Sequence, residues 1–226
     1  MIKIKKGNIF TTNLQTIVNT VNSVGIMGAG IAYEFRIRFP DMFNKYKIFC
    51  DNGQLDIGKL WIYKIKESNN ENYEFILNFP TKKHWKDSTK REYLERGLEK
   101  FVNTYQEKGI ISIAFPLLGA GKGGLKEEES ISIIKKYLKN IDIPIEIWYF
   151  DSTAEDDLYR DFRDKFLNLD NNKLKEQSNL RMDLIDKIKS ALERDDINSL
   201  SGLLTVKGIG AITIEKSFKF IKKTHY

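Results

Sequence analysis

The chain has 226 residues, of which 41% are hydrophobic and 30% charged, a balance typical of a packed globular protein and not of wholesale disorder. Its single cysteine excludes an intrachain disulfide and favours a reducing cytoplasm, its two histidines lie too far apart to suggest a metal site, and no apolar run approaches the roughly 18–20 residues of a membrane helix. The net charge of +6 falls on residues 1–150, where 23 Lys and Arg outnumber 17 Asp and Glu, so this part either attracts a polyanion or has a lysine-rich solvated surface.

Strand-like and helix-like segments alternate over residues 1–151. Such alternation predicts an α/β layered domain, in which ligands bind at the carboxyl ends of the strands. In chain order, the first half contains strand Ile2–Ile4, strand Thr16–Thr20, helix Ile31–Phe39, helix Met42–Cys50 and strand Lys59–Ile65. After a polar turn at Glu67–Asn72, it continues with strand Glu74–Phe79, helix Lys90–Lys108, strand Ile110–Pro116, helix Glu127–Asn140 and strand Ile143–Phe150.

Residues 152–226 differ in composition and predict a small helical region. We expect helices at Ala154–Leu167 and Met182–Arg194, a polar linker at Asp170–Ser178 between them, and a final helical segment over Leu200–Ile221.

Two glycine-rich segments, Gly25–Gly30 and Gly119–Gly124, each follow a predicted strand and precede a predicted helix. Glycine lets a backbone approach a ligand closely, and the N–H groups at a helix start bind anions. Neither segment matches a P-loop or a dinucleotide-binding GxGxxG motif. Each alone could be an ordinary turn, but together they predict a site that holds a diphosphate from two sides.

Asn19 and Asn22 flank the first glycine-rich segment. Their amides can donate to and accept from ribose hydroxyls, which makes both candidates for ligand contact. The alternative is that they fix the backbone of the loop.

Three strings carry a resemblance to a known family. They are VNTVNSVGIMGAGIAYEF from Val18, NFPTKKHW from Asn78 and FPLLGAGKGGL from Phe115. They resemble the macrodomain family, and within it the DNA ADP-ribosyl glycohydrolase antitoxins of the DarG type and the terminal ADP-ribose protein glycohydrolases. The resemblance covers residues 1–151 and implies a three-layer α/β/α fold with a mixed sheet that binds ADP-ribose across the strand ends. It does not cover residues 152–226.

The resemblance also implies how ADP-ribose would bind. Asn8 and Ile9 would lie near the adenine, where many macrodomains have an aspartate in place of Asn8. Asn22 would hold the distal ribose, and the two glycine-rich loops would wrap the diphosphate. The predicted ADP-ribose-binding set is Asn8, Ile9, Asn19, Asn22, Gly28, Ala29, Gly30, Ile31, Thr81, Leu118, Gly119, Ala120, Gly121, Lys122 and Gly123.

Lys82 is the catalytic candidate, because in the similar glycohydrolases the lysine directly after the threonine of this string is catalytic. A neutral lysine amine can attack the anomeric carbon of a ribose and form a Schiff base that water resolves. Partial burial and the neighbouring Lys83 would both lower its pKa. A general base, a group that orients the ribose and a plain surface lysine are the alternatives. No cofactor is implied.

Some relatives place an aspartate in the second glycine-rich loop, where this chain has Gly123. DarG-like sequences share the glycine version, which favours a nucleic-acid substrate over protein glutamate. His84 is an accessory acid or base candidate, with a surface or helix-capping role as the alternative. Trp85 and Trp61 could stack on a base, although burial is the commoner fate of tryptophan.

The segment Leu204–Ala211 resembles the hairpin of a helix-hairpin-helix motif, which contacts DNA phosphate through backbone N–H groups. We therefore expect Lys207, Gly208 and Gly210 to contact DNA within a motif spanning about residues 200–221. The alternatives are a protein-packing unit or a docking surface for a toxin.

The leading hypothesis is a glycohydrolase that removes ADP-ribose from a thymidine-type base of single-stranded DNA and so neutralises a DNA ADP-ribosyltransferase toxin. The first alternative is a non-catalytic module that binds ADP-ribose or a signalling nucleotide. The second is hydrolysis of ADP-ribose from acidic residues of proteins.

Overall fold

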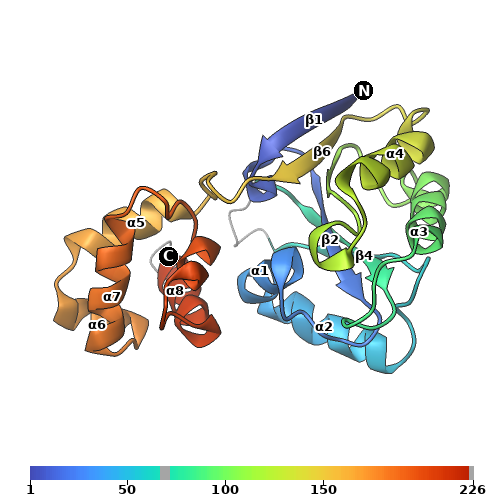
Figure 1. Cartoon of the computed structure of the whole chain (residues 1–226). Helices are drawn as coiled ribbons and strands as arrows, with labels where there is room; N and C mark the ends of the chain where they lie inside the picture. Colours follow the sequence, from blue (N-terminus) through green and yellow to red (C-terminus); the bar gives the residue numbers. More distant parts are fainter. Residues whose placement is uncertain (67–71, 224–226) are drawn as a thin grey trace. The chain divides into compact units, whose positions relative to one another are not determined.

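The computed structural model describes residues 1–66 and 72–223 (Figure 1). The chain divides into two compact units, Met1–Phe150 and Asp151–Tyr226. The polar turn expected at Glu67–Asn72 lies outside the described residues except for Asn72. None of the helices in the described ranges has the length and apolar character needed to cross a membrane.

The first unit is built on a mixed six-stranded sheet in the order β1-β6-β5-β2-β4-β3. Neighbouring strands are parallel except at one edge, where β3 runs antiparallel to β4. The strands are β1 (Ile2–Gly7), β2 (Thr16–Asn22), β3 (Trp61–Lys64), β4 (Phe75–Lys82), β5 (Ile113–Pro116) and β6 (Ile145–Phe150).

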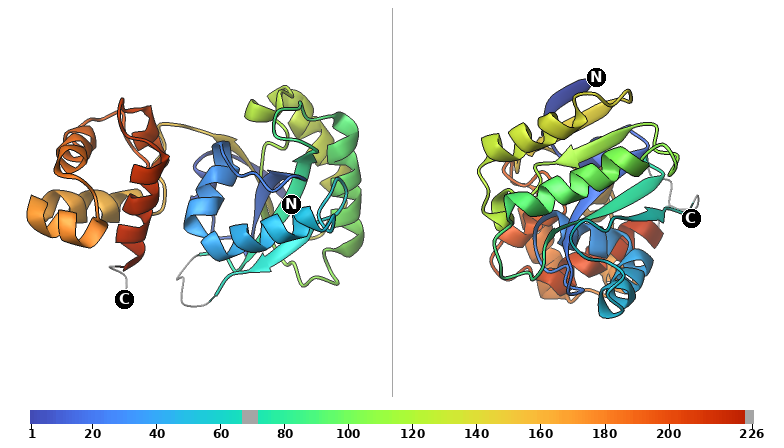
Figure 2. Two further views of the ribbon diagram at one scale, coloured as in Figure 1. Left: turned by 90° about the horizontal axis from the view of Figure 1, so that it is seen from below. Right: turned by 90° about the vertical axis from the view of Figure 1, so that its right-hand side faces the viewer.

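Helices cover both faces of this sheet (Figures 1 and 2). Successive side chains of a strand point to opposite faces, and in β2 Ile17 belongs to one buried apolar cluster while Val18 belongs to the other. The first cluster includes residues of α1 and α2, and the second includes residues of α3 and α4. The helices are α1 (Gly30–Arg38), α2 (Pro40–Asp51), α3 (Arg91–Thr104) and α4 (Glu127–Leu138), with short 3-10 turns η1 (Ile9–Thr11) and η3 (Gly121–Gly123). The predicted three-layer α/β/α fold is confirmed.

Strand β4 extends further than its sequence predicted. The end expected at Phe79 was wrong, because the strand continues through Pro80 and Thr81 to Lys82. β3 pairs with β4 only as far as Asn78, so within the described part of the chain the remainder of β4 pairs with β2 alone. A proline is tolerated on such an unpaired edge. Lys82 is therefore the last residue of a strand and not part of a loop.

The second unit is helical and has its own apolar core. Its elements are α5 (Tyr159–Asn168), α6 (Asn171–Ser178), α7 (Met182–Leu192), η4 (Ser201–Thr205) and α8 (Ala211–Lys223). The linker predicted at Asp170–Ser178 was wrong. Asp170 caps α6 by accepting from two backbone N–H groups, and Leu174 of α6 is buried. The cap and this buried side chain stabilise a helix that the polar composition of the segment does not predict.

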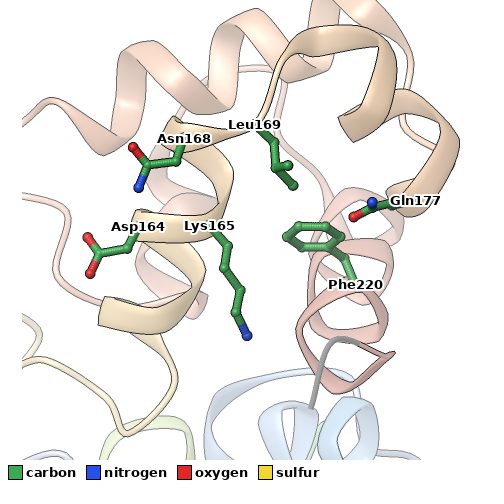
Figure 3. A pocket seen from close by; sticks show the side chains of 6 residues that line it. All are labelled: Asp164, Lys165, Asn168, Leu169, Gln177 and Phe220. Carbon is green, nitrogen blue, oxygen red and sulfur yellow. The ribbon is translucent and has the colours of Figure 1, made fainter. Parts of the chain in front are cut away.

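An open pocket of about 410 Å³ lies within this second unit (Figure 3). It is lined by charged and polar side chains of α5, a glutamine of α6 and an aromatic ring of α8, together with Leu169. The lining residues are Asp164, Lys165, Asn168, Leu169, Gln177 and Phe220. None of them belongs to the predicted ADP-ribose-binding set.

Candidate active site

The residues predicted to bind and react come together at the carboxyl ends of the parallel strands. β2 ends at Asn22, β4 at Lys82 and β5 at Pro116, and parallel pairing brings these ends to the same side of the sheet. The first glycine-rich loop leads from β2 into α1, and the second leads from β5 into α4. This is the position at which α/β sheets bind ligands.

The first glycine-rich loop ends in an uncapped helix start. Gly28, Ala29 and Gly30 are all exposed. Ala29 has the extended backbone of an N-cap residue, but no side chain caps the helix. Gly30 has a φ of +58°, which a residue with a side chain rarely adopts. The first N–H groups of α1 are thus available for an anion, as the diphosphate prediction requires.

The second loop also presents backbone donors. Gly121 and Lys122 are exposed residues, and the backbone N–H of neither has an acceptor among the described residues. The loop is closed by hydrogen bonds from Gly123 N–H to Ala120 carbonyl, at 3.1 Å, and from Leu125 N–H to Gly119 carbonyl, at 3.1 Å. The two loops therefore present backbone N–H donors on two elements, α1 and η3.

Two other glycines of the second loop have a packing role that sequence reasoning missed. A Cβ on Gly119 would lie 2.6 Å from Thr89 Cγ2, and a Cβ on Gly123 would lie 2.7 Å from Thr89 Oγ1. The Thr89 N–H also donates to the Gly123 carbonyl at 2.8 Å. Thr89 is only 5% exposed, and its hydroxyl has no hydrogen-bond partner in the described structure. No local motif marks Thr89, because its role depends on a contact over some 30 residues of chain.

Lys82 joins the second loop to the end of β4. Its Nζ donates to the backbone carbonyl of Lys122. Partial burial lowers the pKa of Lys82, and the Asp87 carboxylate opposes this by raising it. The expected contribution of Lys83 is absent, because burial rather than a second cation lowers this pKa.

The charge of Lys83 instead lowers the pKa of Asp56, in the loop that follows α2. The Lys83 carbonyl accepts from the Ser23 N–H at 3.0 Å, and the Ser23 hydroxyl donates to Asp56 Oδ1 at 2.9 Å. Burial raises the pKa of Asp56, but hydrogen bonds from Ile57 and Ser23 and the charge of Lys83 hold it below its usual value. These contacts tie the ends of β2 and β4 together beside Lys82.

Asn19 and Asn22 both lie within β2 and are buried. The Asn19 amide donates to Asn78 Oδ1 at 2.9 Å, while its own Oδ1 has no hydrogen-bond partner among the described residues. Asn22 donates to the Ile26 carbonyl at 2.5 Å and accepts from the Val24 N–H at 3.0 Å. In the described structure both amides make internal contacts, and those of Asn22 shape the loop that leads to α1.

The predicted adenine residues lie at η1. Asn8 is 3% exposed and caps η1, because its Oδ1 accepts from the Phe10 N–H at 3.1 Å. Its amide nitrogen has no acceptor within the described ranges, which leaves a donor at this position. Ile9 is buried in the apolar cluster on the α1 and α2 face.

The buried carboxylate of Glu146 holds the residue that follows η1. Glu146 accepts from the Thr12 hydroxyl at 2.8 Å and from Trp148 Nε1 at 2.9 Å, and pairs with Lys5 Nζ at 2.6 Å. Burial raises the pKa of Glu146, but these three donors hold it below its usual value. No local motif predicts this cluster, because its members come from β1, β6 and the residue that follows η1.

The remaining predicted residues vary in exposure. Ile31 in α1 and Ala120 in the second loop are partly exposed beside the glycines. Thr81 is buried and its hydroxyl donates to the Val21 carbonyl at 3.5 Å, and Leu118 is fully buried in the cluster on the α3 and α4 face. These two side chains therefore support the strand ends and leave only their backbone to face a ligand.

His84, which is partly buried, and Trp85, which is exposed, lie in the turn directly after β4. The His84 Nδ1 accepts from the Lys86 N–H at 3.3 Å, so its neutral ring carries the proton on Nε2. Trp85 is 50% exposed. Trp61, in contrast, packs edge-on against Phe49 with ring centroids 4.8 Å apart.

In the second unit, Lys207, Gly208 and Gly210 lie on an exposed turn before α8. Gly208 has a φ of +91°, and the turn closes through a bond from the Ile209 N–H to the Val206 carbonyl at 3.0 Å. Across the described residues of both units, no group of three or more His, Cys, Asp or Glu side chains could hold a metal ion.

The sequence matches the Macro domain family over residues 18–134, a little over half of the chain. The chain belongs to the macrodomain family. The matched region of this macrodomain contains Asn22, the start of α1, Lys82 and the whole second glycine-rich loop.

Two curated relatives of the macrodomain carry the name DNA ADP-ribosyl glycohydrolase. The protein from Thermus aquaticus is 39% identical over 151 residues, which are 67% of this chain and 41% of that protein. The protein from Mycobacterium tuberculosis is 40% identical over 129 residues, 57% of this chain and 36% of that protein. The chain thus spans about two fifths of the length of these relatives.

Solved structures agree with the sequence comparison. The macrodomain of Mycobacterium tuberculosis DarG superposes with a TM-score of 0.62 at 36% identity, covering 66% of this chain and 97% of that one. The macrodomain of Thermus aquaticus DarG gives 0.60 at 38% identity, covering 67% and 98%. Thermosipho africanus DarTG in complex with ADP-ribose gives 0.60 at 34% identity, covering 64% of this chain and 40% of that one.

Proposed function

We propose that this macrodomain is a glycohydrolase that removes ADP-ribose from a thymidine-type base of single-stranded DNA, and that it acts as the antitoxin of a DNA ADP-ribosyltransferase. The observation that carries the proposal is the position of Lys82. A lysine whose pKa is lowered by burial lies at the end of β4 and contacts the loop that offers donors to a diphosphate.

The chemistry follows from this position. With the diphosphate between the start of α1 and η3, the distal ribose extends toward the amine that Lys82 presents at the second loop. The neutral amine attacks C1 of that ribose, the bond from C1 to the base breaks, and the base leaves with a proton. The sugar opens to a Schiff base on Lys82, and water hydrolyses it to free ADP-ribose and the original amine. Burial favours the neutral amine that the first step needs.

The composition of the second loop supports a DNA substrate. Gly123 lies where some related glycohydrolases carry an aspartate, and the Thr89 hydroxyl occupies the space that a side chain there would need. The named relatives from Thermus aquaticus and Mycobacterium tuberculosis are DNA ADP-ribosyl glycohydrolases, and a fused transferase and glycohydrolase is known from Thermosipho africanus. These names support both the substrate and the toxin partner of this proposal.

The turn before α8 supplies a second contact with DNA in this proposal. Lys207, Gly208 and Gly210 are exposed there, and Lys187 of α7 reaches the same turn, because a Cβ on Gly208 would lie 2.5 Å from its Nζ. Backbone donors and lysines of this kind bind phosphate without reading sequence.

The test compares wild type, Lys82→Ala and Lys139→Ala on a single-stranded oligonucleotide ADP-ribosylated on thymidine. Lys139 is exposed and follows α4, in the connection that leads to the amino end of β6, so its variant controls for the loss of a lysine far from Lys82. We expect Lys82→Ala to lose turnover by at least about 100-fold, since it removes the reacting group. Calorimetry should show that it still binds ADP-ribose.

Other outcomes separate the alternatives. Full turnover by Lys82→Ala would remove this lysine from the mechanism. Binding of ADP-ribose without turnover of any adduct would indicate a non-catalytic module, and release from glutamate-modified protein but not from DNA would overturn the substrate. Borohydride trapping of a covalent adduct identifies attack at C1, whereas turnover without an adduct assigns Lys82 as a general base.

A further inference from the structure

Trp85 differs from the other tryptophans of the chain in leaving half of its surface to solvent. Trp148 is 7% exposed and donates to Glu146, and Trp61 packs on Phe49. A tryptophan that leaves half of its surface exposed contributes less to the fold through burial, and its ring face is open to a base where lysines lie beside it. The Trp85 indole N–H also has no hydrogen-bond acceptor among the residues that the structure describes.

Local contacts hold the Trp85 ring in place. The turn is fixed by hydrogen bonds from the Lys86 N–H to His84 Nδ1, at 3.3 Å, and from the Asp87 N–H to the His84 carbonyl, at 3.1 Å. The His84 ring lies beside the indole with centroids 5.5 Å apart and planes inclined by 31°. Lys86 Nζ lies 5.1 Å from the indole centroid. The three residues His84, Trp85 and Lys86 therefore form a preorganised aromatic platform with a cation.

The platform lies close to the reacting group and in a basic setting. Trp85 follows Lys82 by three residues, a path of at most roughly 10 Å. Lys83 and Lys86 are exposed in the same turn, and Asp87 is the single acidic residue between Lys82 and Lys90. This charge complements a phosphate backbone that passes the site.

We propose that Trp85 stacks on the base next to the ADP-ribosylated one in a single strand of DNA, with Lys86 at the phosphate between them. This inference rests on the proposed function, because the modified base must stand at Lys82. Aromatic stacking beside lysines is how proteins hold single strands without reading sequence. A duplex keeps its bases stacked on one another and has no free base face for the indole.

The first measurement uses ADP-ribosyl-thymidine and the same adduct within a single-stranded decamer. We expect the ratio of kcat/KM, decamer over nucleoside, to fall about 5- to 150-fold in Trp85→Ala, the range that corresponds to loss of one stacked base. Trp85→Phe should lose less because it keeps an aromatic face. Lys86→Ala should lower the ratio in a salt-dependent way, and Lys139→Ala should not. A ratio within twofold of wild type in Trp85→Ala would overturn the proposal.

The second measurement needs no hydrolysis, so it separates this inference from the proposed function. An unmodified single-stranded decamer should quench tryptophan fluorescence in wild type and in Trp61→Phe, but much less in Trp85→Phe. Equal quenching in Trp85→Phe would contradict stacking on Trp85. Quenching by a duplex or by polyglutamate at equal concentration would contradict the commitment to single-stranded DNA. If the decamer quenches but no adduct is hydrolysed, the platform stands and the glycohydrolase proposal falls.

Discussion

The amine of Lys82 donates a hydrogen bond to the backbone carbonyl of Lys122, which joins the end of β4 to the second glycine-rich loop. The bond fixes where the amine stands before any substrate arrives. It also links the state of the amine to the shape of the loop that is proposed to bind the diphosphate, so in the proposed mechanism binding and reaction share one structural element.

The pH profile of hydrolysis should report the ionisation of Lys82. Because burial lowers the pKa of Lys82, kcat/KM should rise with pH, and the midpoint of that rise should lie below the usual lysine value of 10.5. The Asp87 carboxylate raises this pKa, so Asp87→Asn should move the rising limb to lower pH. Profiles of wild type and Asp87→Asn measured at constant ionic strength check the direction.

Asp142→Asn is the matched control for that profile. It removes the same charge from an exposed position just before the amino end of β6, whereas Asp87 follows the carboxyl end of β4. We expect its rising limb to coincide with that of wild type. A shift of Asp87→Asn toward higher pH, or no shift, would contradict the assignment of the limb to Lys82.

Substitution of Gly123 should strain the second loop against Thr89. A Cβ at position 123 would lie 2.7 Å from the Thr89 hydroxyl oxygen, so Gly123→Ala should lower the free energy of unfolding by about 1–3 kcal/mol. Thr89→Ala removes that oxygen, and the double variant should recover most of the loss. Chemical denaturation of the single variants and the double variant gives the coupling energy.

Gly119→Ala tests the same packing with a different expected outcome. Gly119 meets Thr89 Cγ2 and also has a φ of +70°, so Thr89→Ala should restore only part of its stability. Strictly additive effects in both double variants would show that Thr89 does not support the loop.

The start of α1 should respond to charge at its N-cap. Ala29 already has the extended backbone of a cap, so Ala29→Asp should stabilise the helix by about 0.5–2 kcal/mol. The same carboxylate would repel a diphosphate, and the Kd for ADP-ribose should rise roughly tenfold or more. Thermal unfolding and calorimetry measure the two effects.

Ala29→Ser separates capping from charge in that experiment. It supplies an oxygen acceptor without a charge, so its Kd should change far less than that of Ala29→Asp. Equal affinity for ADP-ribose in wild type and Ala29→Asp would show that the diphosphate does not bind at the start of α1.

Glu146 should make stability depend on pH in the acid range. Its pKa in the folded protein lies below the ordinary value, so its contribution is present above about pH 4.5 and is lost as pH falls through the folded pKa. Glu146→Gln, which loses the partner of Lys5, should cost about 1.5–3 kcal/mol at pH 7. The free energies of unfolding of wild type and Glu146→Gln, measured by chemical denaturation, should therefore converge as pH falls from 5 to 3. A difference that stays constant over this range would contradict the role of Glu146.

The alternation of strands and helices and the two glycine-rich loops were predictable because each depends on residues close together in sequence. The positions of Thr89 and Glu146 were not, because their partners come from other elements. Local pattern also gave a wrong linker at Asp170–Ser178, where a cap and one buried leucine decide in favour of a helix. The inward amides of Asn19 and Asn22 show that polar residues near a ligand loop also serve the core.

The pairing of β1 with β6 has a consequence for synthesis on the ribosome. Ile2 pairs with Ile145, so the first strand of the sheet acquires its neighbour only after almost the whole unit has been translated. Contacts between such distant residues form slowly, and until then the growing chain exposes an unprotected strand. Because η1 follows β1 directly, the residues predicted to lie near adenine reach their final positions only after this late pairing.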